Sequence, residues 1–360
     1  MVVTSAVSIR LLASRTLNQL RCWTSYALSL FGVVRVRHLP TFVSVEPANF
    51  CQLRCPECPV GTASSPNRPI ASGVPEKSAD FWGALSPHRL MPLSIFERVL
   101  EQVQSTAHTM QFYFQGEPLL NKQLPEMIAM AHQVGLYTIV STNAQAITQP
   151  IAEALVKSGL NRIIVSIDGF SEDSYAAYRV GGSLHKALEG LLYLANAKIK
   201  CHSRIRIELQ VLRLKTNEHE WDWIKKNYKK LGATHLVFKT AQLYNFEHGH
   251  PLMPTDERYS RYRKTADGTY VHKSSPLHST PYTLHRAFGA LCLRLWSGCV
   301  ITTNGDVLPC CYDKDHRHAY GNIMQQSLAE LYHSTKANAL RRRVLLYQGE
   351  PLEMCKNCNK

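Results

Sequence analysis

Three cysteines stand close together in the segment Cys51-Gln-Leu-Arg-Cys55-Pro-Glu-Cys58. Three thiolates on one short loop can bind three irons of a cubane iron–sulfur cluster and leave the fourth iron open. An open coordination position separates catalytic metal sites from structural ones, an argument made for zinc that carries over to iron. Three thiolates also suit zinc, which would need a fourth ligand close by. The spacing favours a cluster over zinc.

A second group of cysteines lies near the end of the chain. Twelve residues separate Cys292 from Gly305, and four separate Gly305 from Cys310. A glycine at this point permits a tight turn that brings the two thiols together. Cys355 and Cys358 form a C-x2-C pair that can complete four ligands. Four thiolates would close the site, which indicates a structural or electron-relay cluster.

Two further cysteines of this region, Cys299 and Cys311, are surplus to a set of four. Cys311 adjoins Cys310 and can take its place. A four-cysteine zinc site is the alternative to a cluster. Clustered spacing of this kind is typical of metal ligation rather than of disulfides. Because thiolate-bound clusters need a reducing compartment, we expect a cytoplasmic protein.

From Thr41 onward the chain alternates between strand and helix patterns. The predicted strands span residues 41–46, 111–115, 137–141, 162–167, 204–212 and 234–239. The predicted helices span residues 93–104, 123–134, 148–158, 184–196 and 217–231. Six βα repeats imply a parallel sheet with right-handed crossovers, closed as a partial (β/α)6 TIM-like barrel. The first cysteine loop then follows the first strand, at the barrel end where active sites lie.

We divide the chain into four parts. They are a basic amphipathic segment (1–40), the barrel (41–240), a linker region (241–288) and a small cysteine-rich domain (289–360). In the last part, Asn304-Gly305-Asp306 predicts the turn of a hairpin. The fold class is therefore α/β with a small C-terminal domain.

The N-terminal segment has an unusual charge. Residues 1–45 hold five arginines and no Asp or Glu, and residues 5–31 can form an amphipathic helix. Three interpretations stay open: a helix packed against the barrel, a peripheral membrane helix and an organellar transit peptide. No apolar run reaches the roughly 18 residues needed to span a bilayer. The net charge of +14 is scattered along the chain, and we expect no specific nucleic-acid partner.

The cysteine triad, the order of elements and the next motif resemble the radical S-adenosylmethionine (SAM) superfamily. The second strand ends in Gly116-Glu117-Pro118, which is similar to the family's Gly-Gly-Glu-Pro motif with Gln115 in place of the first glycine. The resemblance covers residues 41–360. It implies a 4Fe–4S cluster on the triad, and SAM chelated to the open iron. One electron then cleaves SAM to a 5′-deoxyadenosyl radical, which abstracts hydrogen from a substrate.

The same resemblance implies which strand ends contact SAM. The expected SAM-binding residues are Gln115, Gly116, Glu117, Pro118, Ser141, Asn143, Ser166, Asp168, Arg179 and Gln210. Small polar side chains suit a ribose or a carboxylate, and Arg179 can pair with the SAM carboxylate bidentately. Lys239 is expected at the same mouth of the barrel, which is the end formed by the carboxyl ends of the strands. The sequence departs from the family at Glu57, where an aromatic residue usually contacts the adenine.

The C-terminal spacing resembles the SPASM and twitch extensions of radical SAM enzymes. Full SPASM domains carry more cysteines and two auxiliary clusters. We therefore expect one auxiliary 4Fe–4S cluster, on Cys292, Cys310, Cys355 and Cys358.

We expect a radical SAM oxidoreductase that modifies a peptide or protein, reduced by a reductase or flavodoxin-type electron donor. The alternative is an enzyme that dehydrogenates or epimerises a small molecule such as a sugar or aminocyclitol. A peptide substrate would favour a precursor-binding element, and the N-terminus carries no clear one. The remote alternative is a zinc-stabilised binding protein without enzymatic activity.

Overall fold

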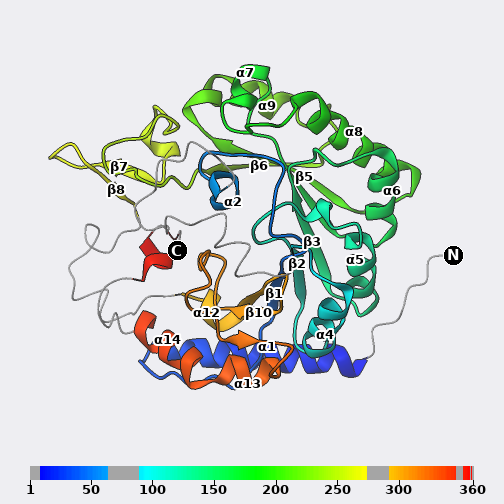
Figure 1. Cartoon of the computed structure of the whole chain (residues 1–360), viewed down its shortest axis with the longest axis vertical. Coiled ribbons are helices and arrows are strands. Elements are labelled where there is room, and N and C mark those ends of the chain that lie inside the picture. The colour runs from blue at the N-terminus through cyan, green and yellow to red at the C-terminus, as the bar shows by residue number, and fades with distance from the viewer. Residues whose placement is uncertain (1–8, 64–88, 274–291, 346–351, 357, 359–360) are drawn as a thin grey trace.

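A curved parallel sheet forms the centre of the protein. The structure, a computed structural model, describes residues 9–63, 89–273, 292–345, 352–356 and 358. Six strands pair in chain order, each parallel to the next. They are β1 (Phe42–Val45), β2 (Thr109–Phe112), β3 (Tyr137–Thr142), β4 (Arg162–Ser166), β5 (Arg206–Arg213) and β6 (His235–Thr240). Figure 1 shows the curvature of this sheet, and the predicted partial barrel is confirmed.

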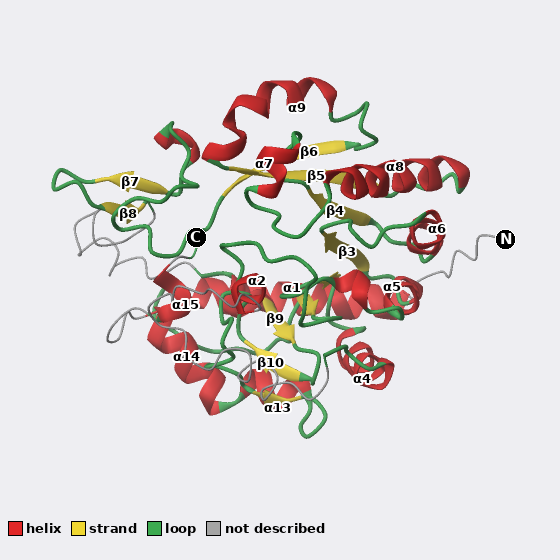
Figure 2. Ribbon diagram, turned by 45° about the horizontal axis from the view of Figure 1, so that its top comes forward, coloured by secondary structure: helices red, strands yellow, loops and turns green. Residues whose placement is uncertain are grey.

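Helices cover the outer side of the sheet (Figure 2). They are α4 (Leu93–Val103), α5 (Leu124–Gln133), α6 (Gln149–Lys157), α8 (Leu184–Lys200) and α9 (Trp221–Asn227), with the short α7 (Glu172–Ala176). α4 illustrates why these segments are helical. Ile95, Phe96 and Val99 recur on one side and are buried, whereas Glu97 and Arg98 between them are exposed. An apolar stripe with this period packs one face of a helix on the sheet.

Several predicted element boundaries shift by a few residues, among them the end of β2 and the start of α9. β2 ends at Phe112 because the Tyr113 carbonyl leaves the ladder and accepts a hydrogen bond from Ser44 Oγ at 2.6 Å. The helix predicted over 217–231 begins as the 3₁₀ turn η2 (Lys215–Glu220) before α9. Local side-chain hydrogen bonds thus compete with regular structure at both ends.

The C-terminal region extends the barrel sheet rather than forming a separate one. The added strands are β9 (Gly298–Ile301), β10 (Asp306–Leu308) and β11 (Gly321–Asn322). β9 lies parallel to β1, and the next two are antiparallel. The predicted turn is present, with Gly305 at a φ of 88°. The other elements here are α12 (Arg294–Ser297), α13 (Leu328–His333), α14 (Thr335–Leu345) and α15 (Glu353–Lys356).

The region predicted as a linker contains a small sheet of its own. β7 (Tyr262–Lys264) and β8 (Tyr270–His272) pair antiparallel. Residues 274–291 of this linker lie outside the described residues. The four domain boundaries stay a prediction.

The N-terminal segment forms α1 (Ile9–Ser29), which packs against α12 and runs along the lower side of the molecule in Figure 1. Residues 5–8 of the predicted helix lie outside the described part of the chain. Among the described residues, no helix is long and apolar enough to cross a membrane.

Candidate active site

The first cysteine loop leaves the carboxyl end of β1. Backbone bonds hold the loop: Arg54 N donates to Val180 O at 2.9 Å, and Cys58 N donates to Cys55 O at 3.2 Å. Burial raises the pKa of Cys51 to about 12 and that of Cys55 to about 11. Thiols held in this way lose their protons when a metal binds, because the ligand must be the thiolate.

The three thiols of the loop lie near one another, since the charges of Cys58 and Cys55 both act on Cys51. In a cubane cluster, each of three such thiolates binds a different iron. The donor set of Cys51, Cys55 and Cys58 therefore fits the expected cluster.

Gly116 forms a cradle against the cysteine loop. Its φ is 69°, a region that favours glycine. A Cβ at this position would lie 2.4 Å from Ala48 O and 2.7 Å from Phe50 N. Both contacts are backbone atoms just before Cys51, so no flexible side chain can move aside. Glycine is required here for the strand end to touch the loop.

Glu117, which follows β2, is hydrogen-bonded to the end of the neighbouring strand β3. One carboxylate oxygen accepts from Thr142 Oγ1 at 2.6 Å and from Leu119 N at 3.2 Å, and the other accepts from Asn143 N at 2.8 Å. Burial raises the pKa of Glu117, and these donors offset part of that shift. The carboxylate fixes the end of β3 beside the cysteine loop, where Asn143 Nδ2 donates to Cys51 Sγ at 3.4 Å.

Asp168 and Arg179 form a buried ion pair next to the triad. Arg179 Nη2 lies 2.5 Å from Asp168 Oδ2, and Arg179 Nη1 lies 3.9 Å from Cys55 Sγ. Although burial alone lowers it, the Asp168 carboxylate leaves the pKa of Arg179 raised. The second oxygen of Asp168 accepts from Leu212 N at 2.6 Å. This pairing places a cation beside the cysteine loop.

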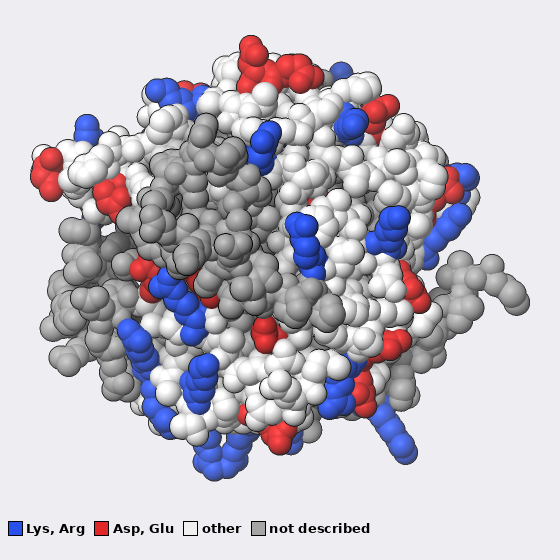
Figure 3. Space-filling view, in the orientation of Figure 1, with Lys and Arg blue, Asp and Glu red and all other residues white. Residues whose placement is uncertain are grey.

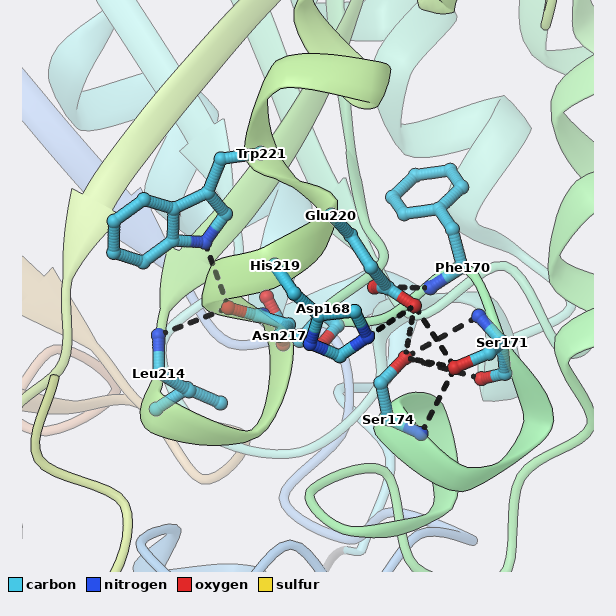
Figure 4. A network of polar contacts seen from close by, with 9 residues as sticks. All are labelled: Asp168, Phe170, Ser171, Ser174, Leu214, Asn217, His219, Glu220 and Trp221. Atoms are coloured by element: carbon cyan, nitrogen blue, oxygen red, sulfur yellow. Dashed lines mark hydrogen bonds and ion pairs between the residues drawn. The ribbon is translucent and has the colours of Figure 1, made fainter. Parts of the chain in front are cut away.

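A polar network stabilises the loop that follows Asp168 (Figure 4). The Glu220 carboxylate accepts from Phe170 N at 2.9 Å and from Ser174 Oγ at 2.7 Å. Asn217 Nδ2 donates to the Asp168 carbonyl at 2.8 Å. η2 thereby holds the backbone that carries Asp168 and the start of α7. Sequence reasoning missed Asn217 and Glu220, because neither belongs to a motif.

The second cysteine group surrounds the amino end of β9. Arg294 Nη1 donates to Cys311 Sγ at 2.9 Å, and Tyr312 N donates to Cys310 Sγ at 3.4 Å. The charge of Cys292 acts on Cys310, and that of Cys358 acts on Arg294, so these side chains share one region. The pKa of Cys311 is lowered, first by a hydrogen bond with Cys310 and then by nearby cations.

The structure separates the two surplus cysteines. Cys299 lies on β9 within the apolar core, and burial raises its pKa to about 12. Cys311 instead lies with Cys310 and contacts Arg294. Cys311 is thus placed where it can serve as a ligand in exchange for Cys310, whereas Cys299 is placed for packing.

The segment that follows β2 connects the mouth of the barrel with the second cysteine group. Gln115 Nε2, at the mouth, donates to Lys314 O in the C-terminal region at 2.9 Å. Tyr113, directly after β2, is half-buried; its desolvation raises its pKa to about 12, and the charges of Arg162 and Cys311 also act on it. The segment after β2 therefore contacts the C-terminal region that contains the second cysteine group.

Two family comparisons match these two regions. The sequence model of the radical SAM superfamily matches residues 45–207. That of an iron–sulfur cluster-binding domain, SPASM, matches residues 292–359. The chain belongs to the radical SAM superfamily. Like other radical SAM enzymes it uses SAM and iron–sulfur clusters, and the first matched region contains the triad while the second contains the C-terminal cysteines.

A curated relative is similar over most of the chain. The PqqA peptide cyclase of Xanthomonas campestris pv. campestris (strain 8004) is 26% identical in an alignment of 339 positions that covers 89% of this chain and 80% of the relative. The PqqA peptide cyclase of Rhizobium meliloti (strain 1021) is 25% identical over 68% of this chain and 65% of its own length.

Solved structures share the radical SAM fold. SuiB of Streptococcus suis bound to S-adenosylmethionine has a TM-score of 0.59, at 14% identity over 84% of this chain and 68% of SuiB. Native anSMEcpe with bound AdoMet has a TM-score of 0.55, at 15% identity over 89% of this chain and 86% of that chain. The arrangement of the barrel and its C-terminal extension is therefore that of known radical SAM enzymes.

The structure brings most predicted SAM-binding residues to one mouth. Ser141, Ser166 and Gln210 lie at adjacent strand ends, and Gln210 Nε2 donates to Ser166 Oγ at 3.4 Å. Gln115 Oε1 is buried and has no hydrogen-bond partner among the described residues. An orphaned acceptor beside Gly116 fits the ammonium group of SAM, which needs acceptors.

Glu57, the departure from the radical SAM pattern, has a structural partner. Its carboxylate accepts from Tyr244 N at 2.6 Å and lies 3.2 Å from His250 Nε2. Where the family has an aromatic residue, this chain therefore anchors the segment after β6 to the cysteine loop. Neither partner is close in sequence, so no local pattern predicts this contact.

Proposed function

We propose that the protein is a peptide-modifying radical SAM maturase. The observation that carries the proposal is the hydrogen bond from Gln115 Nε2 at the mouth to Lys314 O, three residues after Cys311, because it places the second cysteine region beside the mouth and suits a substrate within reach of both. When bound, the cofactors supply one-electron cleavage of SAM to methionine and a 5′-deoxyadenosyl radical that takes a hydrogen atom from the substrate. The protein orients SAM and substrate and keeps water away.

The curated relatives support a peptide as substrate. The Xanthomonas relative, similar over 89% of this chain, is named PqqA peptide cyclase. Oxidation of a peptide releases two hydrogens, and an auxiliary cluster in the C-terminal region, which contacts the mouth, suits the removal of the second electron.

We assign roles to the residues of the mouth. Cys51, Cys55 and Cys58 hold the SAM-binding cluster, as a 4Fe–4S centre. Gln115 accepts from the SAM ammonium. Arg179, directed by Asp168, receives the SAM carboxylate, since a guanidinium binds carboxylates in a fixed geometry.

The roles of the remaining predicted residues follow from their positions. Ser141, Ser166 and Gln210 line the side of the mouth that suits a ribose, and Asn143 supports the cysteine loop. The auxiliary 4Fe–4S cluster binds Cys292, Cys310, Cys355 and Cys358, with Cys311 able to replace Cys310.

The cations around Lys239 favour a peptide that carries an acidic side chain. Burial lowers the pKa of Lys239, Glu208 raises it, and the nearby charges of Arg162, Arg261 and Arg294 lower it further, so several cations share this space. Arg162 Nη2 is already paired with Glu208 at 2.6 Å. Nη1 of Arg261 is buried and has no hydrogen-bond partner among the described residues. A substrate carboxylate would satisfy this unpaired charge.

The electron donor is a flavodoxin-type or reductase protein with an acidic surface. The net charge of +14 favours such a partner.

The test uses anaerobically reconstituted protein with SAM and dithionite, and short peptides encoded beside its gene. We expect formation of 5′-deoxyadenosine together with a peptide product lighter by two hydrogens. The same peptides with Glu and Asp changed to Gln and Asn should react with a kcat/KM at least about ten-fold lower, as expected for one lost charge pair. SAM cleavage without any change in a peptide, but with oxidation or epimerisation of a sugar or aminocyclitol, would contradict the peptide proposal.

A further inference from the structure

α1 packs on the barrel with a polar face rather than an apolar one. Its buried side chains are Arg15, Asn18, Cys22, Ser25 and Ser29, which recur every three or four residues. Such spacing places them along one side of the helix. An ordinary amphipathic helix buries its apolar side, so the orientation of α1 is reversed.

The polar face satisfies carbonyls at the lower end of the barrel. Arg15 donates to Gln104 O at 2.9 and 2.7 Å, to Val134 O at 2.6 Å and to Gly135 O at 2.9 Å. These carbonyls lie where α4 and α5 end, and a cation is favourable at helix C-termini. Asn18 binds both the N–H and the C=O of Leu39.

These contacts fix the position of α1 against one end of the barrel. Each partner lies just before β1, β2 or β3, and Cys22 Sγ donates to Trp296 O just before β9, at 3.6 Å. α1 therefore covers the amino ends of the strands, whereas the first cysteine loop follows the carboxyl end of β1. The exposed face of α1 points away from the SAM-binding mouth.

The outer side of α1 and the turn after it is apolar. Leu20 is 59% exposed, Trp23 is 50% exposed and Phe31 is 84% exposed. The other exposed apolar side chains of this surface are Ile9, Leu12, Leu17, Leu28, Leu30 and Val33. A monomer in water rarely exposes so many large apolar side chains on one surface without a partner for them.

Exposed arginines lie on α1 and on the segment that follows it. Arg10, Arg21, Arg35 and Arg37 are exposed, and residues 1–45 contain no Asp or Glu. Figure 3 shows further Lys and Arg side chains along the lower left edge, over α14 and α13. The exposed cations of α14 include Arg342 and Arg343. Pairing of two copies through this surface would place arginines against arginines, because a two-fold interface joins a patch to itself. An anionic surface is the better complement.

We propose that the outer face of α1 binds the surface of an anionic lipid bilayer. Trp23, Leu20 and Phe31 enter the boundary between headgroups and acyl chains, as in other interfacial helices. The arginines attract the anionic headgroups. The protein then lies on the bilayer with its SAM-binding mouth directed away from the lipid, open to substrate and electron donor. This surface is independent of the peptide proposal, since no residue of the mouth belongs to it.

The test is co-sedimentation of the cluster-loaded protein with vesicles of phosphatidylcholine, with or without phosphatidylglycerol. We expect binding to the anionic vesicles and release by high salt, because Arg–headgroup attraction is screened. The variant Leu20→Glu/Trp23→Glu should bind at least about ten-fold more weakly, given the lost apolar contact and the added negative charge. Its SAM cleavage should equal that of the wild type.

A matched control carries the same changes on another surface. Leu192 on α8 is 46% exposed and Trp223 on α9 is 50% exposed, and both helices lie on the far side of the barrel from α1 (Figure 2). Leu192→Glu/Trp223→Glu should bind vesicles like the wild type. The proposal is overturned if anionic vesicles do not retain the wild-type protein, or if both double variants lose binding equally. It is also overturned if the wild type is a dimer that ignores vesicles and that only Leu20→Glu/Trp23→Glu dissociates.

Discussion

The two cysteine regions differ in what surrounds their thiols. Near the first loop, the cation Arg179 is already paired with Asp168 at 2.5 Å, and backbone atoms of the loop pack against Gly116. Near the second group, Arg294 donates directly to Cys311 Sγ at 2.9 Å. The first region offers three thiols and a rigid cradle, whereas the second offers more thiols and a cation of its own.

This difference indicates two kinds of centre. A three-thiol site with a fixed backbone wall leaves room for a small molecule at the fourth iron. A fuller thiol set with a charged donor close to sulfur is suited to holding a cluster and tuning its potential, because hydrogen bonds and charge near the sulfurs set that potential. Substitutions in the first region should therefore affect SAM cleavage, and those in the second region should affect electron transfer.

Loss of one thiol in each region gives the largest contrast. Cys55→Ala should abolish formation of 5′-deoxyadenosine, because the first cluster loses one of its three protein ligands. Cys358→Ala should roughly halve the iron content, as expected when one of two four-iron centres is lost, yet keep SAM cleavage while product formation is lost. Iron and sulfide analysis, with chromatography of 5′-deoxyadenosine and substrate, measures both.

The assignment of the two regions fails if Cys358→Ala also abolishes SAM cleavage in protein that retains the first cluster. Zinc in place of iron in the wild type would instead favour the binding-protein alternative.

Gly116→Ala should produce the next largest effect. Its Cβ would lie 2.4 Å from Ala48 O at a φ of 69°, so the strand end must move away from the cysteine loop. We expect unfolding to become easier by about 3 kcal/mol, a value typical of strain combined with a backbone clash. SAM cleavage should fall by about a hundred-fold, as for other misplacements of about 1 Å. Thermal unfolding and 5′-deoxyadenosine formation measure these effects.

Gly268 provides the matched control, since its φ is 88° and a Cβ there would meet nothing within 4 Å. Gly268→Ala should cost only about 1–2 kcal/mol of backbone strain and leave SAM cleavage intact. Equal losses in both variants would show that strain alone, not the contact with the cysteine loop, explains the effect at Gly116.

Much of the first site could be predicted from sequence, because its parts are local. The thiols of the triad lie within eight residues, and Gly116-Glu117-Pro118 is contiguous. The partners of these residues could not be predicted. Glu117 was expected to contact SAM, yet its carboxylate is occupied by Thr142 and Asn143 across the sheet. Pairings of this kind depend on strand register, which the pattern of one strand does not contain.

The N-terminal helix gives the opposite lesson. Its existence and its amphipathic pattern were predicted, and the structure confirms the helix. Which face of this helix is buried could not be predicted from the pattern, because amphipathic helices usually bury their apolar side chains. Here the carbonyls of Gln104, Val134 and Gly135 require a donor, and Arg15 supplies it. The need of buried carbonyls for partners outweighs the burial of leucines.

Arg294→Gln should affect electron handling more than SAM cleavage. Removal of a cation beside Cys311 makes the reduced auxiliary cluster less stable, so its midpoint potential should become more negative. We expect product formation to fall by about ten-fold, the effect of one lost charged hydrogen bond, while 5′-deoxyadenosine formation changes little. Electrochemical titration followed by electron paramagnetic resonance measures the potential. An unchanged potential together with loss of SAM cleavage would place Arg294 in the first site instead.

The smallest effect concerns the contact between the end of β1 and the turn that joins β9 to β10. Glu46 follows β1 and accepts from Thr303 N at 3.3 Å, next to the β9–β10 turn. Burial raises the pKa of this carboxyl from 4.5 to about 8. Because the folded state favours the protonated form, its contribution to stability is complete below pH 4.5 and is lost as the pH rises through about 8. The wild-type free energy of unfolding should therefore fall over this window, by at most about 1.4 kcal/mol per pH unit.

Glu46→Gln keeps the hydrogen bond to Thr303 N and removes the charge, so its unfolding free energy should vary less steeply between those two pH values. Denaturant titrations of wild type and variant at matched pH give the difference between their free energies of unfolding. The contributions of all other titrating groups cancel in this difference. The two curves should diverge toward high pH, with the variant favoured. Parallel curves would mean that Glu46 ionises without cost at this contact, and that its protonation does not help to join the C-terminal strands to the barrel.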